Sequence, residues 1–299
     1  MPELPDVEIY VERLNALFAS AVLRKFTVAG PSVLATWAPR PSALDGLTVR
    51  RFTRRAKRIV VEFAEGPVVA VHLMIAGRFH LKRPGTAAPH RNLQALFDFE
   101  AGRLLLTEVS TKKRATIHIF ETAAGLATLD RGGLEPLTAT RAEFEAALRR
   151  ENHTVKRALT DPRLFSGIGN AYSDEILHRA RLSPMVLTKR MTDAQVDRLH
   201  EATRTSLAGW VERLRTEVGD GFPEKVTAFR PDMAVHGRYG KPCPDCGAPV
   251  QRIVYADNEM NYCARCQTGG KLLADRALSR LLRSDWPKTL DDLEERTGP

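Results

Sequence analysis

The sequence has no apolar run of about 18 residues, which is the length that a membrane-spanning helix needs. Its first residues, MPELPDVE, are acids and prolines where a secretion signal would have a basic and then an apolar stretch. No internal repeat and no low-complexity tract is found, which argues against a solenoid or a disordered chain. We therefore expect a folded cytoplasmic protein.

Cysteine is scarce, and all four cysteines lie near the C-terminus. Cys243 and Cys246 form one CxxC pair, and Cys263 and Cys266 form a second, with a spacer between them about as long as a β-hairpin. This spacing delivers four thiolates to one zinc ion, and four protein ligands leave no open position, so we expect one structural Zn²⁺. Two disulfides are the alternative, which a cytoplasmic location disfavours.

The composition predicts a globular protein that binds a polyanion. The 299 residues are 43% hydrophobic and 27% charged, and the length is about twice the common domain size. The net charge is +9. No basic amphipathic helix stands out, so DNA or RNA is a better candidate partner than a membrane surface.

The hydrophobic pattern changes along the chain. Helical spacing after the opening PELP predicts a first helix, and residues 21–121 show short alternating runs that predict an antiparallel β-sandwich. Beyond about residue 130 the pattern is helical, with capping boxes at Thr140 and Thr192, a tight turn at 166–169, and a helix capped by Asn170. Residues 251–262 are expected to form a hairpin between the cysteine pairs. The fold class is thus α+β.

Four separated segments resemble one family. The opening Met1–Glu8, the segment Arg54–Lys57, the turn Gly167–Tyr172, and Val235–Arg238 with the cysteines after it are similar to the formamidopyrimidine-DNA glycosylase and endonuclease VIII family, the helix-two-turn-helix DNA glycosylases. The resemblance extends to about residue 267. It implies a catalytic domain at 1–130, a helix-two-turn-helix domain at 131–234 and a zinc finger at 235–270, followed here by an extension at 271–299.

The resemblance gives the first residues a catalytic role. Once Met1 is removed, Pro2 has a free secondary amine with an ordinary pKa near ~8, so a useful fraction is a neutral nucleophile at pH 7. Attack on C1′ of a nucleotide gives a cationic iminium that favours elimination. Glu3 is the expected acid and base, and Lys57 the family's second proton donor and phosphate contact. An ordinary helix entry is the alternative for Pro2 and Glu3.

Four residues are expected to bind DNA. Asn170 follows two glycines at a helix start, where amides can meet a phosphate, and the family uses its matching asparagine in this way. Lys156 and Arg55 resemble further phosphate contacts, and Tyr172 ends the turn motif. The alternatives are a plain N-cap for Asn170 and a solvated basic strand around Arg55.

Three positions depart from the family pattern. Asn258 stands where the family usually has an arginine, so the phosphate clamp and the δ-elimination do not carry over. In the segment 72–77, Ile75 replaces the methionine that fills the space left by an everted base, or Met74 takes that role. The segment 110–115 keeps charge but lacks the aromatic wedge opposite the lesion. The lesion and the opposite-base preference therefore stay open.

The sequence predicts a bifunctional DNA glycosylase and AP lyase of base excision repair, acting as a monomer on double-stranded DNA with damaged bases or abasic sites, near the nucleoid if the source is bacterial. A non-catalytic damage-binding protein on the same scaffold is the alternative. A third, a general zinc-ribbon module, is disfavoured because the ribbon is a small part of the chain.

Overall fold

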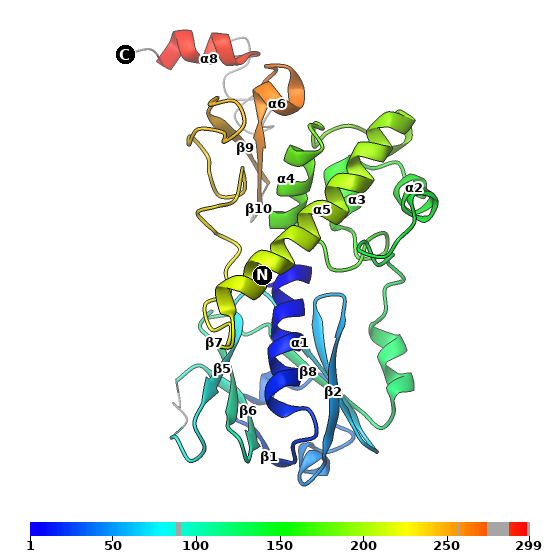
Figure 1. Cartoon of the computed structure of the whole chain (residues 1–299), viewed down its shortest axis with the longest axis vertical. Coiled ribbons are helices and arrows are strands. Elements are labelled where there is room, and N and C mark those ends of the chain that lie inside the picture. Colours follow the sequence, from blue (N-terminus) through cyan, green and yellow to red (C-terminus); the bar gives the residue numbers. More distant parts are fainter. Residues whose placement is uncertain (88–90, 256–257, 274–286, 298–299) are drawn as a thin grey trace. The chain divides into compact units, whose positions relative to one another are not determined.

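The computed structural model describes residues 1–87, 91–255, 258–273 and 287–297, and the chain forms two compact units (Figure 1). Unit 1 comprises Met1–Gly132 and Gly209–Ala228, and unit 2 comprises Gly133–Ala208 and Phe229–Pro299. The chain therefore returns to its first unit for one short segment before it completes the second. None of the helices in the described ranges is both long and apolar enough to cross a bilayer.

Unit 1 consists of helix α1 (Leu4–Phe18) and two four-stranded antiparallel sheets, with strand orders β1-β6-β7-β5 and β2-β3-β4-β8. The strands are β1 (Leu23–Val28), β2 (Val49–Arg55), β3 (Arg58–Phe63), β4 (Val68–His72), β5 (Gly77–Lys82), β6 (Leu93–Phe99), β7 (Arg103–Glu108) and β8 (Thr116–Phe120). Short 3-10 helices lie at η1 (Pro31–Val33), η2 (Pro41–Leu44) and η3 (Ala123–Leu129).

One hydrophobic core joins the helix and both sheets. It contains Tyr10 and Leu14 of α1, Phe97 of β6 and Ile117 of β8, all nearly inaccessible to solvent. Burial of this many apolar side chains is the dominant stabilising term of the unit. The predicted α+β class with a β-sandwich is confirmed. The expected runs miss β1, β2 and β5, because charged side chains on their exposed faces hide the alternation.

The helical part of unit 2 contains α2 (Arg141–Arg149), α3 (Val155–Thr160), α4 (Asn170–Arg179), η4 (Thr188–Arg190) and the first part of α5 (Asp193–Val218). Thr140 and Glu143 form the predicted capping box of α2, and Thr192 exchanges hydrogen bonds with Gln195 before α5. The predicted N-cap Asn170 is wrong by one position. Gly169 is the cap, and Asn170 is the first helical residue.

The remainder of unit 2 is a small ribbon made of β9 (Val250–Tyr255), β10 (Asn258–Cys263) and α6 (Ala264–Thr268), with α8 (Leu290–Thr297) after it. The predicted hairpin is confirmed by the antiparallel pairing of β9 with β10, and β10 packs beside α4 (Figure 1). In the C-terminal extension, Leu290 is 2% exposed and joins the ribbon core. The leucine-rich stretch 277–282 lies outside the described residues.

Candidate active site and DNA-binding network

The N-terminus of α1 holds the two predicted catalytic residues. Pro2 is buried and Glu3 is 3% exposed. Glu3 is the N-cap of α1, its backbone N–H donates to Asp6 Oδ2 at 2.9 Å, and the two residues form a capping box. The ordinary helix entry is therefore present. It also fixes Glu3 directly beside the peptide nitrogen that removal of Met1 would free, so the structural and catalytic interpretations are compatible.

The environment of the N-terminal amine favours its neutral form. Burial lowers the pKa of the α-amino group of Met1 below its usual 8.0, and the nearby charges of Arg78 and Lys57 lower it further. The carboxylates of Glu3 and Asp6 act in the opposite direction and raise the pKa. A neutral amine is the nucleophilic form. Removal of Met1 would place the Pro2 amine one residue away within the same set of charges.

Lys57 lies in the tight turn between β2 and β3. Arg55 pairs with Arg58 across the hairpin, and Ala56 adopts a left-handed φ of 54° that costs an L-residue roughly 1–2 kcal/mol. Burial lowers the pKa of the Lys57 ammonium, and the Glu3 carboxylate opposes that shift. The structure thus brings Lys57 close to Glu3, as a shared proton-transfer site requires, and it leaves Arg55 exposed to solvent.

His72, at the end of β4, is a candidate that the sequence reasoning missed. It lies opposite Arg58 in the sheet, and burial followed by the charges of Arg58, Lys57 and His118 lowers its pKa to about 4. The Nδ1 atom accepts the Met74 backbone N–H at 3.1 Å, so the ring hydrogen resides on Nε2. His72 is therefore a neutral hydrogen-bond donor beside Lys57. Its position at a strand end facing a basic segment was the signal available in the sequence.

Two loops of unit 1 expose apolar side chains. Ile75 is 57% exposed in the turn that Gly77 closes with a hydrogen bond from its N–H to the Leu73 carbonyl. Val109 is 74% exposed at the start of the loop 109–115. Buried Glu108 fixes that loop, because its carboxylate accepts the backbone N–H of Arg114 at 2.9 Å. Of the two void-filling candidates, Ile75 is the more accessible in the structure.

In unit 2, the predicted DNA-binding residues belong to one hydrogen-bond network. The Nδ2 atom of Asn170 donates to the Glu259 carbonyl of β10 at 2.7 Å. Lys156 donates through Nζ to the Asn170 carbonyl at 2.7 Å and to Asp174 Oδ1 at 2.6 Å, which leaves one N–H of the ammonium for a phosphate. Tyr172 is 1% exposed, so a contact with DNA has to use its backbone amide.

Two adjacent carboxylates of α4, each almost fully buried, join the helices to the ribbon. Besides Lys156, Asp174 accepts from His236 Nδ1 at 2.8 Å and from the Asn261 backbone N–H at 3.2 Å. Glu175 accepts the backbone N–H groups of three consecutive residues, 234 to 236, at 2.7–3.0 Å. Charge-assisted bonds of this kind are stronger than neutral ones. The network fixes the segment that enters the zinc ribbon.

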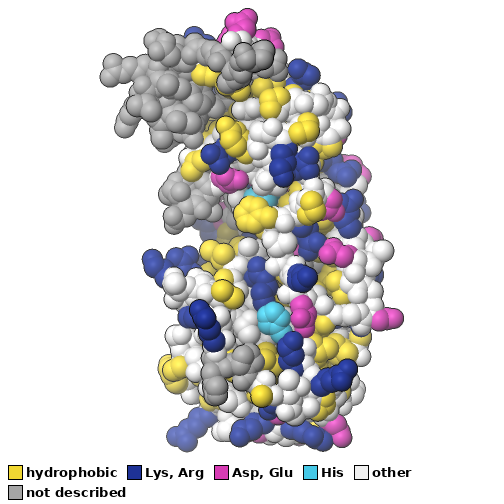
Figure 2. Space-filling model, turned by 90° about the vertical axis from the view of Figure 1, so that its left-hand side faces the viewer, with side chains coloured by type: hydrophobic (Ala, Val, Ile, Leu, Met, Phe, Trp, Pro, Cys, Tyr) yellow, Lys and Arg dark blue, Asp and Glu magenta, His cyan; other side chains and the backbone are white. Residues whose placement is uncertain are grey.

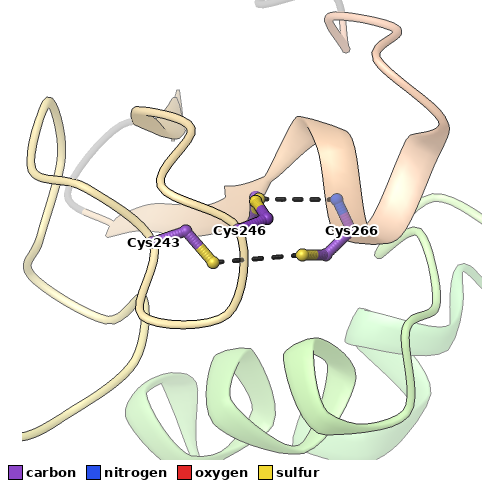
Figure 3. A group of neighbouring side chains, drawn as sticks. Cys243, Cys246 and Cys266 are labelled. Carbon is purple, nitrogen blue, oxygen red and sulfur yellow. Dashed lines mark hydrogen bonds between the residues drawn. The ribbon is translucent and has the colours of Figure 1, made fainter.

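The four cysteines meet in one cluster. Their Sγ atoms lie within 4.8 Å of one another, and all four are free of disulfides. The Sγ atoms of Cys243 and Cys266 point toward each other at 3.9 Å (Figure 3), and those of Cys246 and Cys263 are 3.4 Å apart. A tetrahedral zinc site with Zn–S bonds of 2.3 Å requires about 3.8 Å between sulfurs. The cluster fits one zinc ion, and the disulfide alternative is wrong.

A histidine from α4 contacts this cluster. His178 is 4% exposed, and its Nε2 lies 3.2 Å from Cys243 Sγ. A ring N–H directed at a thiolate offsets the negative charge of a four-thiolate zinc site, as partners of metal ligands commonly do. The side chain of Asn258, at the departure from the family arginine, lies outside the described part of the chain.

The surface carries the charge expected for a polyanion partner. Lys and Arg side chains are spread over the face shown in Figure 2, and Asp and Glu are sparse on it. Several arginines are nevertheless engaged within the protein. Arg54 Nε, for example, donates to Glu8 Oε2 at 2.6 Å, which ties β2 to α1 and gives Arg54 a structural role.

Comparison with known proteins follows the same division of the chain. Residues 1–117 match the formamidopyrimidine-DNA glycosylase N-terminal domain, residues 133–219 the formamidopyrimidine-DNA glycosylase H2TH domain, and residues 240–269 the zinc finger found in FPG and IleRS. The segment between the first two models contains η3, and the zinc-finger model covers all four cysteines.

Relatives match over most of their length. Formamidopyrimidine-DNA glycosylase of Thermus thermophilus is 33% identical over 90% of this chain and 100% of its own. An uncharacterized formamidopyrimidine-DNA glycosylase-like protein of Mycobacterium tuberculosis is 40% identical over 50% of this chain and 94% of its own.

Solved structures share the fold. Lactococcus lactis Fpg in complex with DNA that contains an abasic site has a TM-score of 0.77 and 23% identity, covering 89% of this chain and 99% of that one. MutM in complex with DNA that contains carbocyclic 8-oxo-G has a TM-score of 0.79 and 23% identity, covering 89% and 100%. Together with the family models and the relatives, these matches show that the chain belongs to the formamidopyrimidine-DNA glycosylase family.

Proposed function

We propose that this protein is a bifunctional DNA glycosylase and AP lyase that uses the Pro2 amine as its nucleophile. The observation that carries the proposal is the N-terminus of α1, where Pro2 adjoins the buried Glu3 and the pKa of the terminal amine is lowered. Lys57, beside Glu3, completes a set of one nucleophile and two proton-transfer groups. Damaged double-stranded DNA is the substrate and, in a cell, the chromosome is its source.

The first step exchanges one bond at C1′. The neutral Pro2 nitrogen attacks C1′ of the damaged nucleotide, and the N-glycosidic bond breaks as the base leaves with a proton. Glu3 protonates the sugar ring oxygen, which opens the ring and leaves the Pro2 nitrogen as a cationic iminium. Because this nitrogen is secondary, the iminium stays charged at any pH.

The second step cleaves the strand. The iminium withdraws electrons from C2′, a proton leaves C2′ for Glu3, and the bond from C3′ to its phosphate oxygen breaks. Water then hydrolyses the iminium and restores the amine. Lys57 and the Nε2–H of His72 are placed to donate to the phosphate as negative charge develops on it, which is the effect that preorganised donors supply.

Unit 2 holds the DNA by its backbone. Asn170 and Lys156 are assigned to phosphate contacts, Tyr172 to a contact through its amide, and Arg55 in unit 1 to a further phosphate. The four cysteines hold a structural zinc ion, which supplies no chemistry to the reaction but fixes the hairpin against α4. Ile75 is assigned to the space that a flipped nucleotide vacates, because it is the accessible apolar residue of its loop.

The test is borohydride trapping on a duplex with one abasic site, with the N-terminus shown by mass spectrometry to begin at Pro2. A covalent complex is expected from the wild type and from Pro5→Ala, which changes the neighbouring helix-start proline and keeps the amine. Pro2→Gly retains only a primary amine and should trap weakly, and an N-terminal extension should abolish trapping. A panel of duplexes with oxidised purines, formamidopyrimidines and oxidised pyrimidines then identifies the base.

Two results would contradict the proposal. Tight abasic-site binding without a covalent band would identify a non-catalytic damage-binding protein. A band of equal intensity from the N-terminally extended protein would assign the amine to another residue.

A further inference from the structure

Arg78 has an unusual set of contacts at the start of β5. Its Nε donates to the Val226 carbonyl at 2.6 Å, and its Nη1 donates to the carbonyls of Ile75 at 3.0 Å and Gly77 at 2.6 Å. All three acceptors are uncharged. Among the described residues no carboxylate forms an ion pair with Arg78, so its positive charge is held in place without being neutralised.

Other arginines of unit 1 are different. Arg54 pairs with Glu8 at 2.6 Å, and Arg215 pairs with Glu12. Arg13 donates through Nε to the Gly221 carbonyl at 2.8 Å and lies 3.7 Å from a carboxylate oxygen of Asp220. Arg13 and Arg78 thus both hold the returning segment 209–228, but Arg78 alone of the two acts electrostatically on the N-terminal amine.

The fold brings Arg78 to the amine. Its neighbour Phe79 packs edge-on against Tyr10 of α1 with ring centroids 5.9 Å apart, and Tyr10 also contacts Phe222 of the returning segment. The beginning of β5 is therefore fixed beside the first turns of α1. Because Gly77 lies against the Leu73 backbone, where a Cβ would approach the carbonyl oxygen to 2.3 Å, the turn before Arg78 has little freedom to move.

Two acids and two cations surround the amine. Glu3 and Asp6 stabilise the protonated, unreactive form, and Lys57 and Arg78 destabilise it. Lys57 is itself a buried ammonium with a lowered pKa, so its charge falls as the pH rises, whereas a guanidinium stays charged at every pH used by an enzyme. Arg78 is the permanent cation of this group.

We propose that Arg78 is a positioning residue that opposes protonation of the N-terminal amine and so keeps the nucleophile reactive at neutral pH. The inference rests on the proposed function, since it concerns the amine of that reaction. Its carbonyl contacts hold the guanidinium at a fixed distance, and the missing carboxylate partner leaves its field undiminished. A cation a few Å from an amine in a partly buried site shifts the amine pKa by about half a unit or more.

The experiment measures the pH dependence of covalent trapping with cyanoborohydride, in single turnovers at saturating abasic-site duplex, between pH 5.5 and 9. Arg78→Gln should move the acid limb of the profile up by about half a unit or more, which is about a threefold loss of rate at pH 6 and none at pH 9. Arg78→Lys should keep the wild-type limb because it keeps the charge. Arg13→Gln is the matched control, since it loosens the same segment without removing a charge that acts on the amine.

Three results would overturn the inference: an unchanged limb in Arg78→Gln, an equal shift in Arg13→Gln, or an equal shift in Arg78→Lys, since each removes charge as the cause. If Arg78→Gln does not fold, Arg78→Met, which keeps the length of the aliphatic chain, replaces it under the same criteria. Failure of the proposed function is a separate outcome, because the wild type would then give no Pro2-dependent band at any pH.

Discussion

The buried Asp174 offers the sharpest test of how the helices hold the ribbon. Its side chain is 1% exposed and accepts hydrogen bonds from Lys156 Nζ, His236 Nδ1 and the Asn261 backbone N–H. Asp174→Ala leaves the Lys156 ammonium, itself 11% exposed, without its counter-ion. Removing one partner of a buried ion pair costs about 3–5 kcal/mol, and for a protein of this size that corresponds to a fall in melting temperature of roughly 6–20 °C.

The assay is urea denaturation of the zinc-saturated protein, followed by circular dichroism. The double variant Asp174→Ala/Lys156→Met should recover part of the loss, because no unpaired charge remains buried. Asp197→Ala removes another carboxylate of unit 2, one that is 60% exposed in its pair with Arg141, and should leave the midpoint almost unchanged. A loss below about 1 kcal/mol in Asp174→Ala, or strictly additive single losses in the double variant, would refute the reasoning.

Three further predictions concern zinc, pH and backbone freedom. One zinc ion per chain is expected by metal analysis, and Cys266→Ser should lose it together with duplex binding; full binding by the zinc-free variant would contradict the structural role. The depressed pKa of His72, about 4, means that the unfolded state binds the extra proton between pH 6.5 and 4. Stability should therefore fall through that window by at most about 3 kcal/mol, and the fall should be smaller in His72→Gln; parallel pH profiles of the two proteins would refute this. Gly209→Ala, in an exposed and open position of α5, should stabilise by about 1 kcal/mol, whereas Gly77→Ala should destabilise because its Cβ would meet the Leu73 carbonyl; equal urea midpoints would contradict both.

The sequence predicts the site better than it predicts the packing around it. Patterns that are local, such as the CxxC spacing, the capping box at Thr140 and the alternating strand β6, are each specified within a few residues. The proximity of Glu3 and Lys57 could be expected only from the resemblance, because 54 positions separate them in the chain.

Other features have no local signal. The placement of Arg78 depends on Val226, which is 148 residues away, and the bond between His178 and Cys243 joins residues 65 apart. Side chains of these types are usually solvated, so nothing in the sequence distinguishes them from other surface residues. Asn170 was expected to cap α4, but the preceding glycine takes the cap and the asparagine side chain binds the ribbon instead. Tertiary contacts of this kind override a local preference.

The two adjacent carboxylates of α4 also impose an order on biosynthesis. Glu175 and Asp174 leave the ribosome 59 and 62 residues before their partners Ala234 and His236, and Asp174 waits 87 residues for Asn261. At about 5–20 residues per second this delay is roughly 3–17 s. During that interval a helix that is buried in the finished protein carries two acids with no donors to satisfy them. Its final docking has to await the last cysteine, so the supply of zinc to the nascent chain controls when the DNA-binding half of the protein becomes complete.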